Sequence, residues 1–135
     1  MADFLTPEER SKRMAAVRGK DTKPEMIVRR LVHSLGYRYR LHDRKLPGRP
    51  DLVFKSRRKV IFVHGCFWHH HADCPRSRLP ATRVEFWTRK MSENEQRDCK
   101  NQLDLKSMGY DNMVIWECEF KNMSQLTDRI RGFLG

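Results

Sequence analysis

The sequence contains no long apolar run, no internal repeat and no Pro-, Gly- or Ser-rich stretch that would mark a linker. No apolar segment approaches the ~20 residues that a membrane-spanning helix needs. The first ten residues, MADFLTPEER, lack the basic and then apolar pattern of a secretion signal. These absences favour a cytoplasmic protein over a membrane or secreted one. With 135 residues and no internal boundary, the chain is expected to form a single domain over 1–135.

Acidic side chains are also in short supply. The chain has 17 Asp and Glu against 28 Lys and Arg, which gives a net charge of +11. Such an excess of positive charge on a small domain indicates a polyanionic partner, and nucleic acid is the first candidate. A basic but otherwise ordinary protein is the alternative that charge alone leaves open. Hydrophobic residues make up 39% and charged residues 33%, which is typical of a globular rather than a disordered chain.

Cysteines are few, and their surroundings indicate a metal. A cytoplasmic chain keeps its thiols reduced, so the four cysteines are not expected to form disulfides. Cys66, His71 and Cys74 have the short-range spacing of zinc ligands, and a closed tetrahedral site needs a fourth. Cys118, just after an apolar segment, is the favoured fourth ligand. Cys99 is the alternative, although a buried core thiol explains that residue more simply.

Apolar periodicity and turn signals predict a mixed order of helices and strands. The expected helices span 6–18, 23–35, 92–108 and 123–134, and the expected strands span 37–41, 51–54, 59–64 and 113–116. The third helix is expected to begin at Ser92, which resembles a capping box with Glu95. The segment from Cys66 to Arg83, dense in His, Cys, Pro and Arg, is expected to be a loop. This order predicts a three-layer α/β domain with a mixed sheet.

An aspartate and the adjacent histidines provide a candidate hydrolytic centre. Asp51 follows a proline beside the expected end of strand 59–64, where carboxylate and carbonyl oxygens suit Mg²⁺. Taken alone, a turn aspartate is the more common explanation. A site with three cysteines needs only one of the three histidines, so two remain free, and imidazole is a natural general base. Phe67 and Trp68 either insert between base steps of DNA or pack beneath the zinc loop.

Several ordered blocks of the sequence resemble the Vsr endonucleases of bacterial very-short-patch repair. The blocks are Leu46–Asp51, His64–His69, Ala81–Trp87, Asn94 with Arg97 and Asp98, and Trp116–Cys118. The resemblance implies a restriction-endonuclease-like core with a zinc-binding loop. It also implies an enzyme that nicks one strand of double-stranded DNA next to a T·G mismatch by Mg²⁺-dependent hydrolysis. The expected protein is a bacterial cytoplasmic, nucleoid-associated monomer, with other mismatch-repair proteins as candidate partners.

The resemblance also implies roles for individual residues. Asp51 and the backbone carbonyl of Val63 are the implied Mg²⁺ ligands, and His69 is the implied general base. The positions implied to hold metal-bound waters and to orient the reacting groups are Glu25, His64, Asn94 and Asp98. The implied zinc ligands are Cys66, His71, Cys74 and Cys118. The implied DNA contacts are the aromatic wedge Phe67, Trp68 and Trp87, Met14 on a basic N-terminal helix within 1–19, and Lys90 at base edges.

Two other functions remain open from the sequence. A small restriction-like nuclease acting on matched DNA would share Asp51 and Mg²⁺, so only the choice of substrate separates it from a mismatch enzyme. A zinc-stabilised DNA-binding module without catalysis is the second alternative. Four residues together argue against it, because binding alone does not need buried acids near phosphate: Asp51, His69, Glu25 and Asp98.

Overall fold

A four-stranded mixed sheet forms the centre of the computed structural model, which describes residues 22–135. The strands, in spatial order, are β1 (Arg40–Leu41), β2 (Leu52–Phe54), β3 (Lys59–His64) and β4 (Asp111–Trp116). β1, β2 and β3 pair antiparallel, whereas β3 and β4 pair parallel. The mixed sheet predicted from the sequence is confirmed. The helix predicted over 6–18, and Met14 with it, lie outside the described residues.

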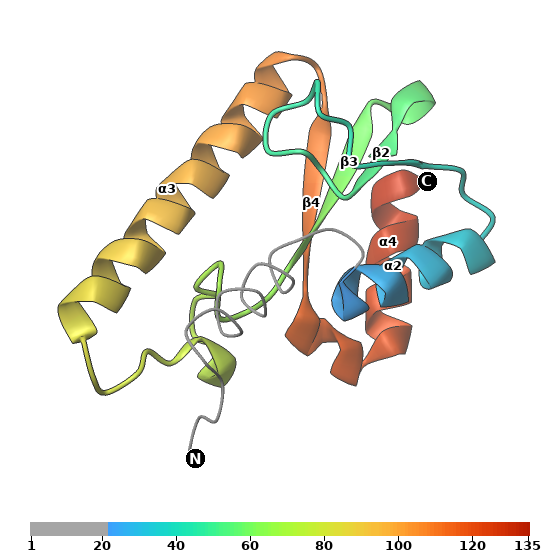
Figure 1. Cartoon of the computed structure of the whole chain (residues 1–135). Helices are drawn as coiled ribbons and strands as arrows, with labels where there is room; N and C mark the ends of the chain where they lie inside the picture. The colour runs from blue at the N-terminus through green and yellow to red at the C-terminus, as the bar shows by residue number, and fades with distance from the viewer. Residues whose placement is uncertain (1–21) are drawn as a thin grey trace.

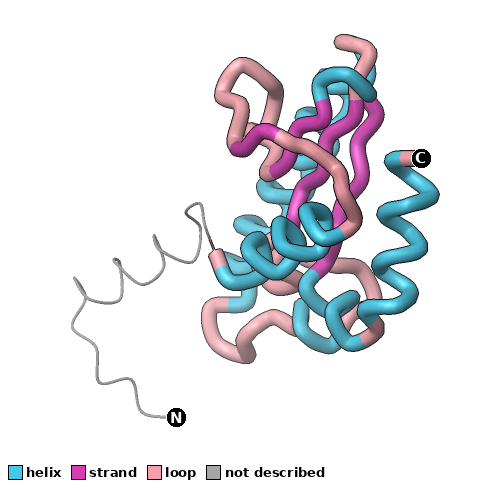
Figure 2. The backbone as a smooth tube through the Cα atoms, turned by 90° about the vertical axis from the view of Figure 1, so that its right-hand side faces the viewer, coloured by secondary structure: helices cyan, strands magenta, loops and turns pink. Residues whose placement is uncertain are grey.

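The helices cover both faces of the sheet. In the described part of the chain they are α2 (Lys23–Ser34), α3 (Val84–Ser107) and α4 (Met123–Leu134). Figure 1 shows α3 on one side of the strands and α2 and α4 on the other. Figure 2, turned by 90°, shows the strands side by side with α4 running along them. The three layers predicted from the sequence are therefore present. Within residues 22–135, no helix is long and apolar enough to cross a bilayer.

The apolar run in β3 explains why both faces of the sheet are covered. Val60 and Ile61 are fully buried and Phe62 is 6% exposed. Since side chains alternate along a strand, Ile61 packs with α2 and α4, whereas Val60 and Phe62 pack with Leu105 of α3. Burying each such side chain stabilises the fold by roughly 1.5–3 kcal/mol. This run anchors the end of β3, from which the loop of candidate site residues departs.

The long helix α3 begins eight residues earlier than the sequence indicated. It starts at Val84, so Ser92 lies inside the helix and the predicted capping box is wrong. The N-cap residue is Arg83, in the left-handed region at φ 55°, and its side chain makes no capping hydrogen bond. Contacts from Trp87 to loop aromatics hold the first turns instead, because packing rather than local signals stabilises most helices. Trp87 and Lys90 therefore lie on a helix.

A close approach between α3 and the loop before β2 positions Asp51. Gly48 adopts φ 77°, and a Cβ atom there would lie 3.0 Å from the side chain of Asn101 on α3. A residue with a Cβ would be strained at that angle and would clash at that distance. The glycine thus allows the loop to cross α3 closely and to enter β2 with Asp51 at the start of the strand.

Candidate functional site

The parallel pairing of β3 with β4 brings the four predicted zinc ligands together. Its register sets His64 opposite Trp116, so Cys66 and Cys118 each lie two residues beyond a paired strand end. Ligand atoms of four residues lie within 4.8 Å of one another, and we call this group the cysteine–histidine cluster: Cys66, His71, Cys74 and Cys118. Cys118 Sγ is 3.5 Å from His71 Nδ1. An edge of about 3.5 Å is expected for a tetrahedron with Zn–S near 2.3 Å and Zn–N near 2.0–2.1 Å.

The surroundings of the cysteine–histidine cluster also fit a bound cation. Burial raises the pKa of the Cys66 thiol to about 12, and a cation that takes thiolate ligands removes that cost. The imidazole of His71 stacks on Trp116 with ring centroids 4.0 Å apart. The Ser77 hydroxyl lies 2.7 Å from both the His71 and Cys74 carbonyls, which holds the loop closed around the ligands.

The structure places Cys99 away from this cluster. Cys99 is exposed on α3, so the expectation of a buried core thiol is wrong. Leu103, one turn further along, is 63% exposed, which shows that this face of the helix points to solvent. Packing of α3 on the sheet uses other positions, such as Leu105.

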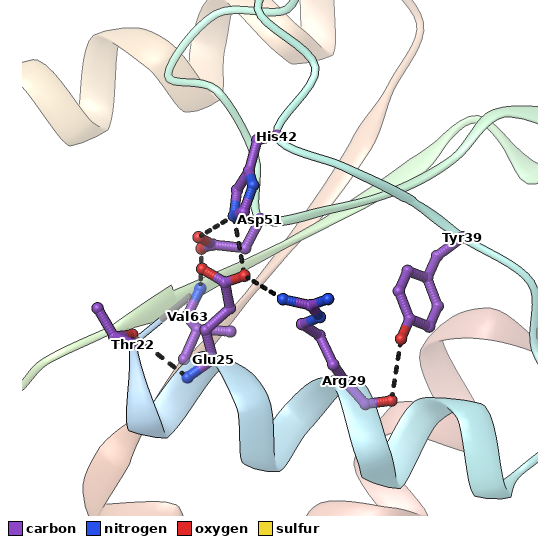
Figure 3. Close-up of polar contacts among 7 residues, drawn as sticks. All are labelled: Thr22, Glu25, Arg29, Tyr39, His42, Asp51 and Val63. Atoms are coloured by element: carbon purple, nitrogen blue, oxygen red, sulfur yellow. Dashed lines mark hydrogen bonds and ion pairs between the residues drawn. The ribbon is translucent and has the colours of Figure 1, made fainter. Parts of the chain in front are cut away.

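Two acids and a histidine from three separate segments form a second group, the carboxylate cluster, which consists of Glu25, His42 and Asp51. Glu25 lies in the first turn of α2, where the helix dipole favours a carboxylate, and it is only 2% exposed. The backbone N–H of Val63 donates to Asp51 Oδ2 at 2.6 Å. Figure 3 shows His42 above the two carboxylates and Arg29 beside Glu25, with Arg29 Nη1 and Glu25 Oε2 3.4 Å apart.

Asp51 is held in an environment that disfavours its charge. Burial and, to a smaller extent, the neighbouring Glu25 carboxylate raise its pKa from 3.8 to about 7. The N–H of Val63 opposes this rise but does not cancel it. Two carboxylates this close and this buried are stabilised by a shared cation, and oxygen donors are those that Mg²⁺ prefers. The donor set therefore fits a hard divalent cation.

The third group joins the loop of the cysteine–histidine cluster to α3. His69 Nδ1 lies 2.6 Å from Asp98 Oδ2, an arrangement that places the proton on Nδ1 and leaves Nε2 as the basic nitrogen. The His69 ring stacks on His64, with centroids 3.6 Å apart. Burial, together with the nearby His69, lowers the pKa of His64 to about 3. His64 is thus neutral near neutral pH and places no second charge beside His69.

Asn94 and the aromatic side chains lie next to this pair. Asn94 is 2% exposed, and its amide donates to the Trp68 carbonyl at 2.8 Å. Phe67 lies 5.1 Å from Trp68 and 5.4 Å from Trp87, between ring centroids. All three rings are half-buried, so they form a partly exposed aromatic cluster rather than part of the core. Lys90 is half-buried one turn after Trp87 on α3.

One cleft of about 1390 Å³ connects these groups. Its lining includes Glu25, His42 and Asp51 from the carboxylate cluster, His64, His69 and Asp98, and the aromatics Phe67 and Trp68. Sequence reasoning missed His42 as a member of the site. The sequence did offer a signal for His42, because strands 37–41 and 51–54 were both predicted. If these strands pair antiparallel as a hairpin, the residue after Leu41 lies opposite Asp51.

Comparisons with known proteins identify the family of this chain. The family model described as DNA mismatch endonuclease Vsr matches residues 2–76. The chain is 47% identical over 134 residues to the type II nicking enzyme V.XorIIP of Xanthomonas oryzae pv. oryzae, covering 99% of this chain and 98% of that protein. It is 42% identical over 128 residues to the DNA mismatch endonuclease Vsr of Escherichia coli, covering 95% and 81%. The type II nicking enzyme V.NmeAIP of Neisseria meningitidis is 38% identical over 130 residues, covering 96% and 92%. The chain therefore belongs to the Vsr family of DNA mismatch endonucleases.

Proposed function

We propose that this DNA endonuclease nicks one strand of a duplex beside a T·G mismatch by Mg²⁺-dependent hydrolysis, in very-short-patch repair. The observation that carries the proposal is the cleft, which joins the buried carboxylate of Glu25 and the partly buried carboxylate of Asp51 to the His69–Asp98 pair. Five cationic side chains line the same cleft: Lys23, Arg29, Arg44, Arg49 and Arg97. Cationic side chains beside a hydrolytic centre suit a phosphodiester backbone. The three-layer core is, on this proposal, restriction-endonuclease-like.

Asp51 and Val63 provide the ligands of the cation on this proposal. The N–H of Val63 fixes one oxygen of the Asp51 carboxylate, which leaves the other oxygen for the cation together with the Val63 carbonyl. Bound there, Mg²⁺ would neutralise charge on the scissile phosphate. Glu25 and Asn94 are both buried and orient water and phosphate within the cleft.

His69 acts as the general base. Asp98 holds its Nδ1, so Nε2 accepts the proton of the attacking water while the water oxygen bonds to phosphorus and a P–O bond of the backbone breaks. His64 stacks on the ring of His69, and its Nδ1 is buried without a hydrogen-bond partner among residues 22–135. Such a nitrogen suits an ordered water in the cleft.

The aromatic cluster accounts for the choice of a mismatch. A mispaired step costs less to open than a matched one, so a wedge of Phe67, Trp68 and Trp87 selects weak steps. Stacking of a base on an aromatic ring stabilises by roughly 1–3 kcal/mol, which offsets much of one opening. Met14 and Lys90 supply further DNA contacts on this proposal. The cysteine–histidine cluster holds a structural Zn²⁺, and one active centre per chain suffices to nick one strand as a monomer.

A nicking assay with four reactions tests the proposal. The purified chain is incubated with T·G duplex or with the matched duplex of the same sequence, each with Mg²⁺ or with a chelator. We expect one strand of the T·G duplex to be cut only when Mg²⁺ is present. Equal cutting of the matched duplex would instead indicate a nuclease for matched DNA, and binding without cutting would indicate a binding module.

A further inference from the structure

The imidazole of His42 lies against both acids of the carboxylate cluster, as Figure 3 shows. His42 Nε2 is 2.8 Å from Glu25 Oε2 and 4.0 Å from Asp51 Oδ1. Neighbouring ligands of an octahedral ion with bonds of about 2.1 Å lie about 3.0 Å apart, and opposite ligands about 4.2 Å apart. The distances from His42 Nε2 to the two carboxylate oxygens are close to these two values, so small side-chain movements bring the three atoms around a common ion.

The backbone holds His42 in this place. The pairing of Leu41 with Leu52 sets the next residue, His42, opposite Asp51, and the N–H of His42 donates to the Asp51 carbonyl at 3.4 Å. His42 adopts φ 45°, a left-handed conformation that is uncommon for a residue with a Cβ atom. Backbone strain of this kind persists only where the surrounding structure enforces it. The strained turn directs the ring toward the two acids instead of continuing the strand.

The environment of Nε2 provides a carboxylate at ion-pair distance but no aligned hydrogen bond from the described residues. This nitrogen is enclosed, and among residues 22–135 no group is aligned to form a hydrogen bond with it, although Glu25 is close. Leaving a buried polar atom without a hydrogen bond is costly. A cation shared with the carboxylates would give the nitrogen an aligned partner.

We propose that His42 Nε2 is a direct ligand of the divalent cation at Asp51. The inference rests on the proposed function, because it concerns the cation of that reaction. Carboxylate oxygens suit Mg²⁺ and Mn²⁺ alike, whereas an imidazole nitrogen favours transition-metal ions over Mg²⁺. The site therefore binds Mn²⁺ more tightly than Mg²⁺, and His42 sets this preference.

Electron paramagnetic resonance with Mn²⁺ tests this assignment on the zinc-loaded full chain. Mn²⁺ bound to wild-type protein should show ¹⁴N coupling in spin-echo spectra, and Asp51→Asn should release the ion. His42→Gln keeps an oxygen donor of similar reach but removes the nitrogen, so the coupling should vanish. The Kd of the His42→Gln variant for Mn²⁺ should rise about tenfold, which is the size of effect seen when metal-site residues are changed. The Kd for Mg²⁺, measured by competition, should change by less than about threefold because the oxygen donors remain.

Two further variants separate this site from other histidines. His33→Gln changes an exposed histidine on α2 and should retain the coupling, as should His69→Ala. The assignment would be overturned if Mn²⁺ bound to wild-type protein showed no ¹⁴N coupling although its binding required Asp51. It would also be overturned if the coupling persisted in His42→Gln. Because the wild-type spectrum alone can refute it, the test does not depend on the folding of a variant. Failure of wild-type protein to nick T·G duplex with Mg²⁺ would refute the proposed function instead.

Discussion

The substitution Asp51→Asn should remove activity while it stabilises the magnesium-free protein. Burial raises the pKa of Asp51 from 3.8 to about 7. For an acid with a raised pKa, stability falls progressively as pH rises from 3.8, the unfolded value, to about 7, the folded value, and the full cost is present above pH 7. At about 1.4 kcal/mol per pH unit, the ionised group costs the fold up to about 4 kcal/mol near pH 8. Asparagine carries no charge and avoids this cost, and it can still accept the N–H of Val63.

Urea unfolding of both proteins in magnesium-free buffer, with zinc retained, measures the effect. The variant should be more stable by about 2 kcal/mol near pH 5.5 and by about 4 kcal/mol near pH 8. Added Mg²⁺ should stabilise the wild type but not the variant, because a ligand stabilises the form that binds it. Asp111→Asn, at an exposed aspartate of β4, should change stability by less than about 0.5 kcal/mol. The prediction would be refuted if Asp51→Asn and wild type had the same free energy of unfolding. It would also be refuted if the difference between them were equal at both pH values.

Three further predictions follow from the site. Replacing any one cysteine of the cysteine–histidine cluster with Ser should abolish stoichiometric zinc, measured by elemental analysis, and destabilise the fold; Cys99→Ser should retain the metal. Trp68→Ala should weaken binding to T·G duplex more than to matched duplex in a titration, since the lost stacking matters only where bases part. His69→Ala should lower single-turnover nicking by ~10²–10⁴-fold while Mg²⁺ and DNA still bind.

Each of these predictions has an outcome that contradicts it. Zinc lost with Cys99→Ser, or kept without Cys118, would show that the ligand set is wrong. Equal losses of affinity on both duplexes would show that Trp68 serves only the packing of the loop. Near-normal nicking by His69→Ala would assign the base to another group, with His64 as the next candidate.

The sequence predicted most of the helices and strands, and where it erred the cause is tertiary. β3 and α4 have the predicted bounds, because a continuous apolar run and a strong helical period are local signals. The first strand is shorter than 37–41 because β1 forms ladder pairs only at Arg40 and Leu41. The start of α3 was missed because Val84 and the residues after it carry no capping signal, and packing of Trp87 on loop aromatics stabilises those turns.

By itself, the amino-acid sequence determined the ligand types and the short spacing between Cys66 and Cys74, because residues this near in the chain stay near in any fold. It also determined that Asp51 would follow a proline at the start of a short strand and that the adjacent histidines would follow the apolar strand 59–64. Only the tertiary structure decided which distant groups join them. The parallel register of β3 and β4 brings Cys118 to Cys66, His71 and Cys74, and α3 brings Asp98 to His69. The antiparallel return from β1 to β2 sets His42 against Asp51 and Glu25. These contacts depend on strand pairing and helix packing over long chain separations, and a pattern confined to one segment of the chain does not determine that register.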